Sequence, residues 1–123
     1  FIKQARRIRK VFGGGMRQAG YLAAAGIYAL EHNIERLGDD HRHAKQIADV
    51  LIEKDFIGRI LPVETNILIF EVEGKYNARE FAAFLKNHAI LCIPISPAQV
   101  RMVTHLDVSE EMVKKVITVI DSM

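Results

Sequence analysis

Three consecutive glycines, Gly13 to Gly15, lie between two basic residues, Lys10 and Arg17. Glycine lets other atoms approach the backbone closely and accepts positive φ values. We expect a helix to begin directly after the glycines with Arg17 in its first turn, where free N–H groups and a partial positive charge are presented. This combination predicts a site for a phosphate or carboxylate. The alternative is a simple break between two helices, because the triplet matches neither a Walker loop nor a dinucleotide-binding fingerprint.

Arg101 is a further candidate for a role in binding or catalysis, because it interrupts an expected strand between Val100 and Met102. A guanidinium can hold a carboxylate through two parallel hydrogen bonds. A charge in a central strand is costly unless it is paired. The position therefore indicates either a carboxylate-binding arginine or an exposed arginine on an outer sheet face, and the flanking residues do not decide between them.

The histidines give weaker indications. His105 and Asp107 could form a general-base pair, but we expect them, with Thr104, to hold the connection between a strand and the following helix by local hydrogen bonds. His41 and His43 are two residues apart on an expected helix, so their side chains diverge by about 200°. That spacing does not suit a shared metal ion, and we assign no metal site.

Cys92 is the only cysteine and lies in an apolar run. We expect a buried, unreactive thiol, because nothing near it in the sequence would lower its pKa. A single cysteine suits a reducing compartment. We expect a cytoplasmic protein, with a mitochondrial location left open.

The elements that must position these residues follow from apolar periodicity. We expect helices over residues 1–12, 16–32 and, from an N-cap at Asn33, to about residue 54. The middle helix is apolar nearly all round, which indicates burial against another part of the protein or another subunit. The chain begins at Phe1 in what reads as mid-helix, so we expect it to be a piece of a longer protein.

The remainder of the chain mixes strands with helices. Strands are expected at residues 66–72, 90–95 and 100–105, the last two forming a hairpin. Helices are expected at residues 78–88, behind a cap formed by Asn77 and Glu80, and from Ser109 onward. Residues 33–123 thus predict an α/β domain of the α+β kind, ordered α-β-α-β-β-α, in which helices cover a mainly antiparallel sheet. Residues 1–32 are expected to be connecting helices.

Charge is distributed unevenly along the 123 residues. Residues 1–17 hold six basic residues and no acidic ones, whereas the remainder holds eleven basic and fifteen acidic residues. A basic helix that binds nucleic acid or an acidic partner is one interpretation. We expect neither nucleic-acid nor membrane binding, because no nucleic-acid motif is present and no apolar run approaches the ~20 residues of a membrane span.

Several segments resemble the low-specificity L-threonine aldolases, which belong to the β-eliminating lyase group of fold-type I pyridoxal-phosphate enzymes. The first is RRxRKxxGGGMRQAG at residues 6–20, and AAAGxYALxxNxxRLxxDH follows at residues 23–41. Thr65-Asn66 before an apolar strand and VRxVTHxDV at residues 100–108 complete the set. The resemblance covers nearly the whole chain, in order.

The resemblance implies an enzyme that uses pyridoxal phosphate as an electron sink to cleave threonine or allo-threonine to glycine and acetaldehyde. It implies that Arg101 binds the substrate carboxylate. It also implies that Lys10 and Arg17 lie near the active site, where in a homotetramer they could contact the cofactor phosphate of a neighbouring subunit.

The family's Schiff-base lysine has no counterpart in this chain, which resembles only the C-terminal small domain and the helices before it. We therefore assign no catalytic residue here and expect the chain alone to be inactive. Two alternatives stay open: another pyridoxal-phosphate-dependent β-eliminating or retro-aldol lyase, and a non-enzymatic binding module with a basic helix.

Overall fold

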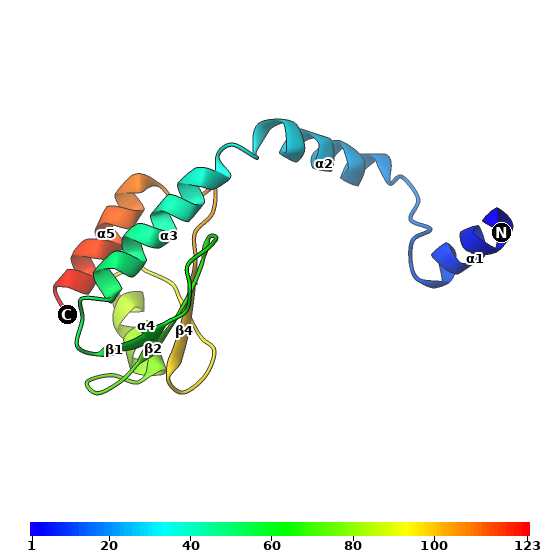
Figure 1. Cartoon of the computed structure of the whole chain (residues 1–123). Helices are drawn as coiled ribbons and strands as arrows, with labels where there is room; N and C mark the ends of the chain where they lie inside the picture. The colour runs from blue at the N-terminus through cyan, green and yellow to red at the C-terminus, as the bar shows by residue number, and fades with distance from the viewer. The chain divides into compact units, whose positions relative to one another are not determined.

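The computed structural model describes residues 1–123, which divide into two compact units, Phe1–Glu35 and Arg36–Met123. The first unit contains two helices, α1 (Ile2–Val11) and α2 (Gly20–His32), both labelled in Figure 1. Neither helix has a buried residue. Basic residues in the last turn of α1 complement the negative end of its dipole.

The glycine segment ends α1 in the way that helix C-termini favour. Gly13 has φ +81°, a left-handed conformation that costs glycine nothing, and the Gly14 N–H donates to the Arg9 carbonyl over 2.8 Å. The expected start of the second helix at residue 16 is wrong, because Gln18 has φ +51° and residues 17–19 form a turn. Arg17 therefore lies before α2 rather than in its first turn.

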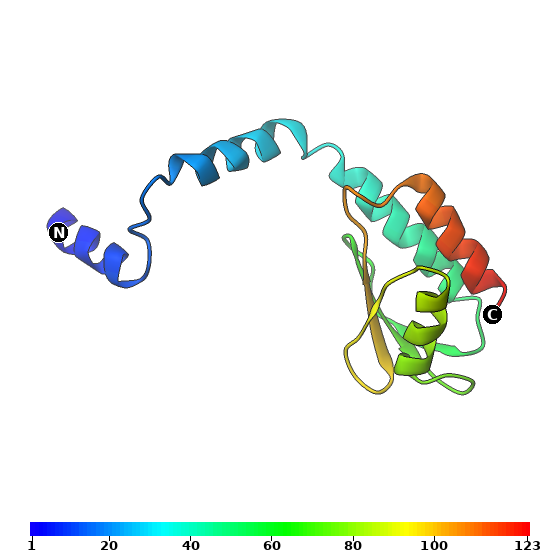
Figure 2. The ribbon, with the colours of Figure 1, turned by 180° about the vertical axis from the view of Figure 1, so that it is seen from behind.

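The second unit folds in the order α3 (Leu37–Leu51), β1 (Ile57–Ile60), β2 (Ile67–Val72), α4 (Ala78–Asn87), β3 (Ile93–Pro94), β4 (Gln99–Val103) and α5 (Glu110–Asp121). The four strands form one antiparallel sheet in the order β1-β2-β4-β3. The three helices cover one face of it, as Figures 1 and 2 show from opposite sides. The expected helix-covered antiparallel sheet is confirmed.

The core lies between this sheet and its helices. Alternate residues of the central strands point into it, with Leu68 and Phe70 from β2 and Val100 from β4 fully buried. Apolar residues at helical spacing close the core from the other side, including Leu51 from α3 and Ile120 from α5. Period-two burial in the strands leaves the opposite sheet face uncovered by any helix of this unit.

Local sequence signals set several boundaries as expected. Asn77 and Glu80 form a complete capping box at the start of α4. The Ser109 hydroxyl accepts a hydrogen bond from the Met112 N–H at the start of α5. The hairpin between β3 and β4 is also present.

Three further expectations are wrong. Asn33 is not an N-cap: it follows the end of α2, where its N–H donates to the Ala29 carbonyl, and α3 begins at Leu37. Residues 57–60 form a strand that was not expected, because Gly58 obscures the apolar pattern of a short edge strand. The strand expected at residues 90–95 is only Ile93–Pro94, since Ala89 has φ +60° and residues 90–92 lie outside the ladder. The order is therefore α-β-β-α-β-β-α.

Candidate functional site

Arg101 lies at the centre of the uncovered sheet face. Its strand, β4, is hydrogen-bonded to β2 on one side and β3 on the other. Ile69 and Ile93 are directly opposite Arg101 on these two strands. Its neighbours Val100 and Met102 are buried beneath the helices, so Arg101 itself points to the open face and is exposed. The structure thus gives Arg101 the outer-face position that the sequence left undecided.

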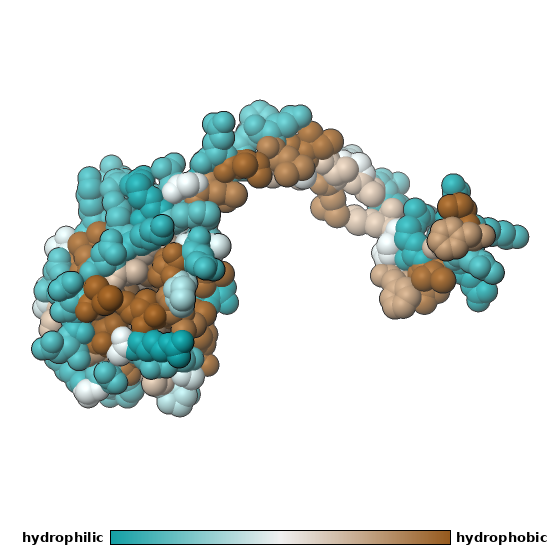
Figure 3. Space-filling model, viewed as in Figure 1, coloured by the Kyte–Doolittle hydropathy of each residue, from teal (hydrophilic) through white to brown (hydrophobic).

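The Arg101 guanidinium forms no ion pair and no side-chain hydrogen bond within residues 1–123. Six ion pairs occur elsewhere in the chain, and none involves it. Apolar residues surround it instead: Ile67 and Ile93 on the flanking strands are 39% and 58% exposed. Hydrophobic side chains are also visible on the face of this unit drawn in Figure 3. A free guanidinium among apolar side chains is suited to bind a carboxylate.

A buried polar junction fixes the end of β4, three residues beyond Arg101. The Thr104 hydroxyl donates to the Asp40 carbonyl of α3 over 2.7 Å, and Thr104 is 2% exposed. Asn66 and Thr104 join the two central strands, with the Asn66 side chain donating to the Thr104 carbonyl over 2.7 Å. The Asp40 carboxylate is buried and paired with Arg36. The junction therefore ties β2, β4 and α3 together close to Arg101.

A second polar pair lies on the same open face as Arg101. Glu71 is directly opposite Gln99, two pairs along the β2–β4 ladder from Ile69 and Arg101. The Gln99 side-chain amide donates to the Glu71 carboxylate over 3.1 Å, and both side chains are half-buried. The sequence offered no signal for this pair, because its two residues are 28 positions apart.

Lys10 and Arg17 belong to the first unit, where both are exposed and neither forms an ion pair. The glycines fold back against the end of α1: a Cβ atom at Gly15 would lie 2.8 Å from Lys10 Cγ, and one at Gly14 would lie 2.7 Å from Arg9 Cγ. Because α2 begins only at Gly20, the glycine N–H groups are not part of its first turn. The expected helix-start contribution to an anion site is wrong, whereas the two cations and the close-packed glycines are present.

His105 and Asp107 interact locally, as expected. His105 Nδ1 lies 3.3 Å from the Asp107 nitrogen, which donates to it, and 3.6 Å from Asp107 Oδ2. Both side chains are more than half exposed, and they border the Thr104 junction without entering it. No hydroxyl or thiol nucleophile is hydrogen-bonded to His105.

His41 and His43 differ in environment. His43 is buried, and its Nε2 lies 3.1 Å from the Glu110 carboxylate of α5, whereas His41 is half-buried without a side-chain hydrogen bond. The hydrogen bond from Arg42, followed by that from His43, lowers the pKa of Glu110. These contacts join α3 to α5. No group of three or more His, Cys, Asp or Glu residues in the chain could hold a metal ion.

Burial raises the pKa of the Cys92 thiol to about 11. Desolvation disfavours the thiolate, and no cation is close enough to offset it. The thiol is half-buried beside the core, which agrees with the unreactive cysteine expected from the sequence.

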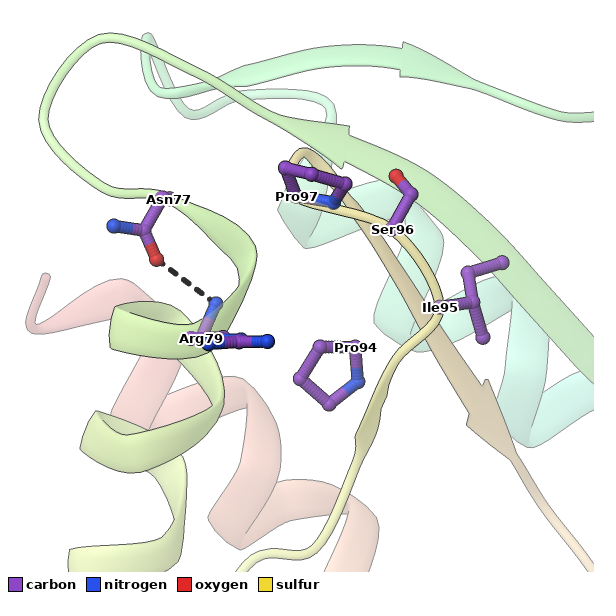
Figure 4. A pocket seen from close by; sticks show the side chains of 6 residues that line it. All are labelled: Asn77, Arg79, Pro94, Ile95, Ser96 and Pro97. Atoms are coloured by element: carbon purple, nitrogen blue, oxygen red, sulfur yellow. Dashed lines mark hydrogen bonds between the residues drawn. The ribbon is translucent and has the colours of Figure 1, made fainter.

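A hollow of about 530 Å³ lies between the start of α4 and the β3–β4 hairpin (Figure 4). Two of its polar side chains are already used, because the Asn77 side chain caps α4 and the Ser96 hydroxyl accepts from the N–H groups of Ala98 and Gln99. The Arg79 guanidinium, which also lines the hollow, forms no ion pair. Arg101 is not among the lining residues. The hollow is therefore separate from the open sheet face.

No helix of the chain combines the length and the apolar character that crossing a membrane requires.

The fold and the sequence both have known relatives. A cystine C–S lyase, solved with its reaction product cysteine persulfide, matches 84% of this chain and 28% of its own, with a TM-score of 0.63 and 18% identity. The ornithine aminotransferase of Toxoplasma gondii matches 72% of this chain and 22% of its own, with a TM-score of 0.58 and 22% identity. These two matches show which known fold the chain shares. A family model described as beta-eliminating lyase matches residues 1–75, and the chain belongs to that family.

Among curated proteins, the low specificity L-threonine aldolase of Escherichia coli K12 is 47% identical over 116 residues, or 94% of this chain and 33% of the relative. The probable low-specificity L-threonine aldolase 2 of Arabidopsis thaliana is 38% identical over 122 residues, or 96% of this chain and 34% of the relative. The chain thus spans about a third of the length of the curated relatives it matches.

Proposed function

We propose that this chain forms part of a pyridoxal-phosphate-dependent L-threonine aldolase, which cleaves threonine or allo-threonine to glycine and acetaldehyde. The observation that carries the proposal is the 47% identity to the Escherichia coli aldolase across 94% of the chain. In this proposal residues 33–123 are the C-terminal small domain and residues 1–32 are the helices that connect it to a larger domain. The compact units divide close to that boundary, between Glu35 and Arg36.

Arg101 binds the α-carboxylate of the amino-acid substrate in this proposal. Its support is the free guanidinium on the open face and the apolar neighbours directly opposite it, Ile69 and Ile93. Two parallel hydrogen bonds from a guanidinium fix both the position and the rotation of a carboxylate. Apolar neighbours strengthen the attraction, because they exclude water and lower the local dielectric constant.

Lys10 and Arg17 hold the cofactor phosphate in this proposal. Both are exposed cations without an ion pair, and charge-assisted hydrogen bonds from a lysine and an arginine suit phosphate oxygens, so the donor set fits a phosphate. When bound, pyridoxal phosphate supplies an electron sink for the electrons of the substrate Cα–Cβ bond. In a homotetramer, Lys10 and Arg17 of one subunit would serve the cofactor of its neighbour.

The proposal assigns no Schiff-base lysine to residues 1–123. This chain therefore orients the substrate and retains the cofactor, while proton transfer and covalent attachment fall to other residues of the whole enzyme. We accordingly expect no threonine cleavage by residues 1–123 alone.

The test is a product assay on the full-length enzyme with L-threonine and L-allo-threonine. The proposal predicts acetaldehyde, measured through NADH consumption by added alcohol dehydrogenase, together with an equal amount of glycine. A second lyase activity is compatible with the family match alone: release of pyruvate from serine or cystine, with no acetaldehyde from threonine, would replace the aldolase proposal by a β-elimination.

A further inference from the structure

Arg101 has an acidic neighbour on its own sheet face, yet the two do not pair. Ile69 is opposite Arg101 and Glu71 is opposite Gln99, so Glu71 occupies the diagonal position relative to Arg101. Diagonal neighbours on an antiparallel sheet lie about 7–8 Å apart, which is within reach of long side chains. No ion pair between Glu71 and Arg101 is present, although both side chains are long enough to form one.

Gln99 accounts for this separation. Its side-chain amide donates to Glu71 Oε1 over 3.1 Å and holds the carboxylate two pairs along the ladder from Arg101. The backbone of Gln99 is itself fixed by the hairpin, because its N–H donates to the Ser96 hydroxyl over 2.9 Å and its carbonyl accepts from the Ile95 N–H over 2.9 Å. The backbone that carries the amide is thus fixed directly opposite Glu71.

We propose that Gln99 is a positioning residue that keeps Glu71 away from Arg101, so that the guanidinium stays free for the carboxylate of the substrate. The inference rests on the proposed role of Arg101. An internal carboxylate on Arg101 would compete with the substrate carboxylate for the same two N–H donors. An ion pair between Glu71 and Arg101 would therefore weaken substrate binding and leave the later bond cleavage unchanged.

The consequence is a defined kinetic pattern. Gln99→Met replaces the amide with an apolar side chain of similar length and leaves the backbone bonds of the hairpin in place. Released from the amide, Glu71 pairs with Arg101. The exposed ion pair between Glu71 and Arg101 is weak, and the substrate carboxylate must displace it. We therefore expect the KM for L-threonine to rise about fivefold while kcat changes less than about twofold.

The experiment is a double-mutant cycle in the full-length holoenzyme, with Gln99→Met, Glu71→Gln and the double variant. KM and kcat are measured for L-threonine, and the dissociation constant of glycine is measured by calorimetry. We expect Glu71→Gln in the Gln99→Met background to restore both KM and glycine affinity. Gln99→Leu, which also lacks an amide donor, is the second variant should Gln99→Met fold poorly, and it has the same expected effect.

An unchanged KM in Gln99→Met and Gln99→Leu overturns the inference, as does a raised KM that Glu71→Gln does not restore, because that result is simple structural damage. Arg101→Lys is run alongside. A weakened Arg101→Lys enzyme with normal Gln99 variants overturns this inference alone, whereas a normal Arg101→Lys enzyme overturns the proposed role of Arg101 and this inference with it.

Discussion

The Thr104 hydroxyl forms a buried hydrogen bond between the end of the sheet and α3. Thr104→Val keeps the shape of the side chain and removes its donor to the Asp40 carbonyl, a 2.7 Å bond at a site that is 2% exposed. Removing one partner of a buried hydrogen bond costs about 1–3 kcal/mol. The Asp40 carbonyl lies within α3, where the helix ladder supplies a second donor, so we expect the lower half of that range, about 1–2 kcal/mol.

The assay is thermal unfolding of the 123-residue chain, followed by circular dichroism. For a unit of this size, about 1 kcal/mol corresponds to a Tm change of roughly 4–8 °C, so Thr104→Val should melt at least about 4 °C lower. Thr118→Val is the matched control, because the exposed Thr118 hydroxyl also donates to a backbone carbonyl, that of Lys114. A Thr104→Val shift no larger than that of the Thr118→Val control would refute the reasoning.

Three further predictions concern single residues of the second unit. Asn77→Ala should destabilise the chain by about 1 kcal/mol in urea unfolding through loss of the α4 cap, whereas Asn77→Asp should be nearly neutral. Bonds from Arg42 and His43 lower the pKa of Glu110 in the folded state, so its stabilising contribution is complete above the unfolded value of 4.5 and is lost as pH falls through the folded value. Glu110→Gln should thus lower Tm at pH 7 and leave it nearly equal to that of the wild type in strong acid. A variant whose Tm equals that of the wild type at pH 7 as well as in strong acid would contradict this. Cys92, with a pKa of about 11, should react with iodoacetamide at pH 8 roughly a hundredfold more slowly than a free thiol, and labelling at the free-thiol rate would refute its burial.

Local signals in the sequence predicted the elements that depend on neighbouring residues. The Asn77–Glu80 capping box, the Ser109 cap and the apolar run of β2 all act over a few positions, and each is present. Where local signals were ambiguous the predictions failed. Asn33 is a good capping residue by type, but the chain turns through residues 34–36 before α3 begins. The short β1 strand exists because β2 offers it an edge, which its own four residues do not reveal.

At the candidate site, too, local sequence signals identified some features, whereas others depend on the fold. The sequence identified Arg101 by its residue type, but the choice between core and open face depends on which strand face the helices cover. The Thr104–Asp40 and Gln99–Glu71 contacts join residues 64 and 28 positions apart, so only the folded chain brings them together. Thr65-Asn66 was noted for its resemblance alone, and the structure adds that Asn66 donates to Thr104 at the end of β4. The roles of Arg101, Lys10 and Arg17 toward ligands stay predictions.

The most direct test of the account is Arg101→Lys in the full-length enzyme, because lysine keeps the charge and loses the two-pronged geometry. Losing a charge-assisted contact worth ~3 kcal/mol should lower kcat/KM for threonine on the order of 10²-fold. Cofactor retention, measured by absorbance after dialysis, should be nearly unchanged, whereas Arg17→Ala should weaken retention first. An Arg101→Lys enzyme with wild-type kcat/KM would contradict the account and leave Arg101 as an ordinary surface arginine.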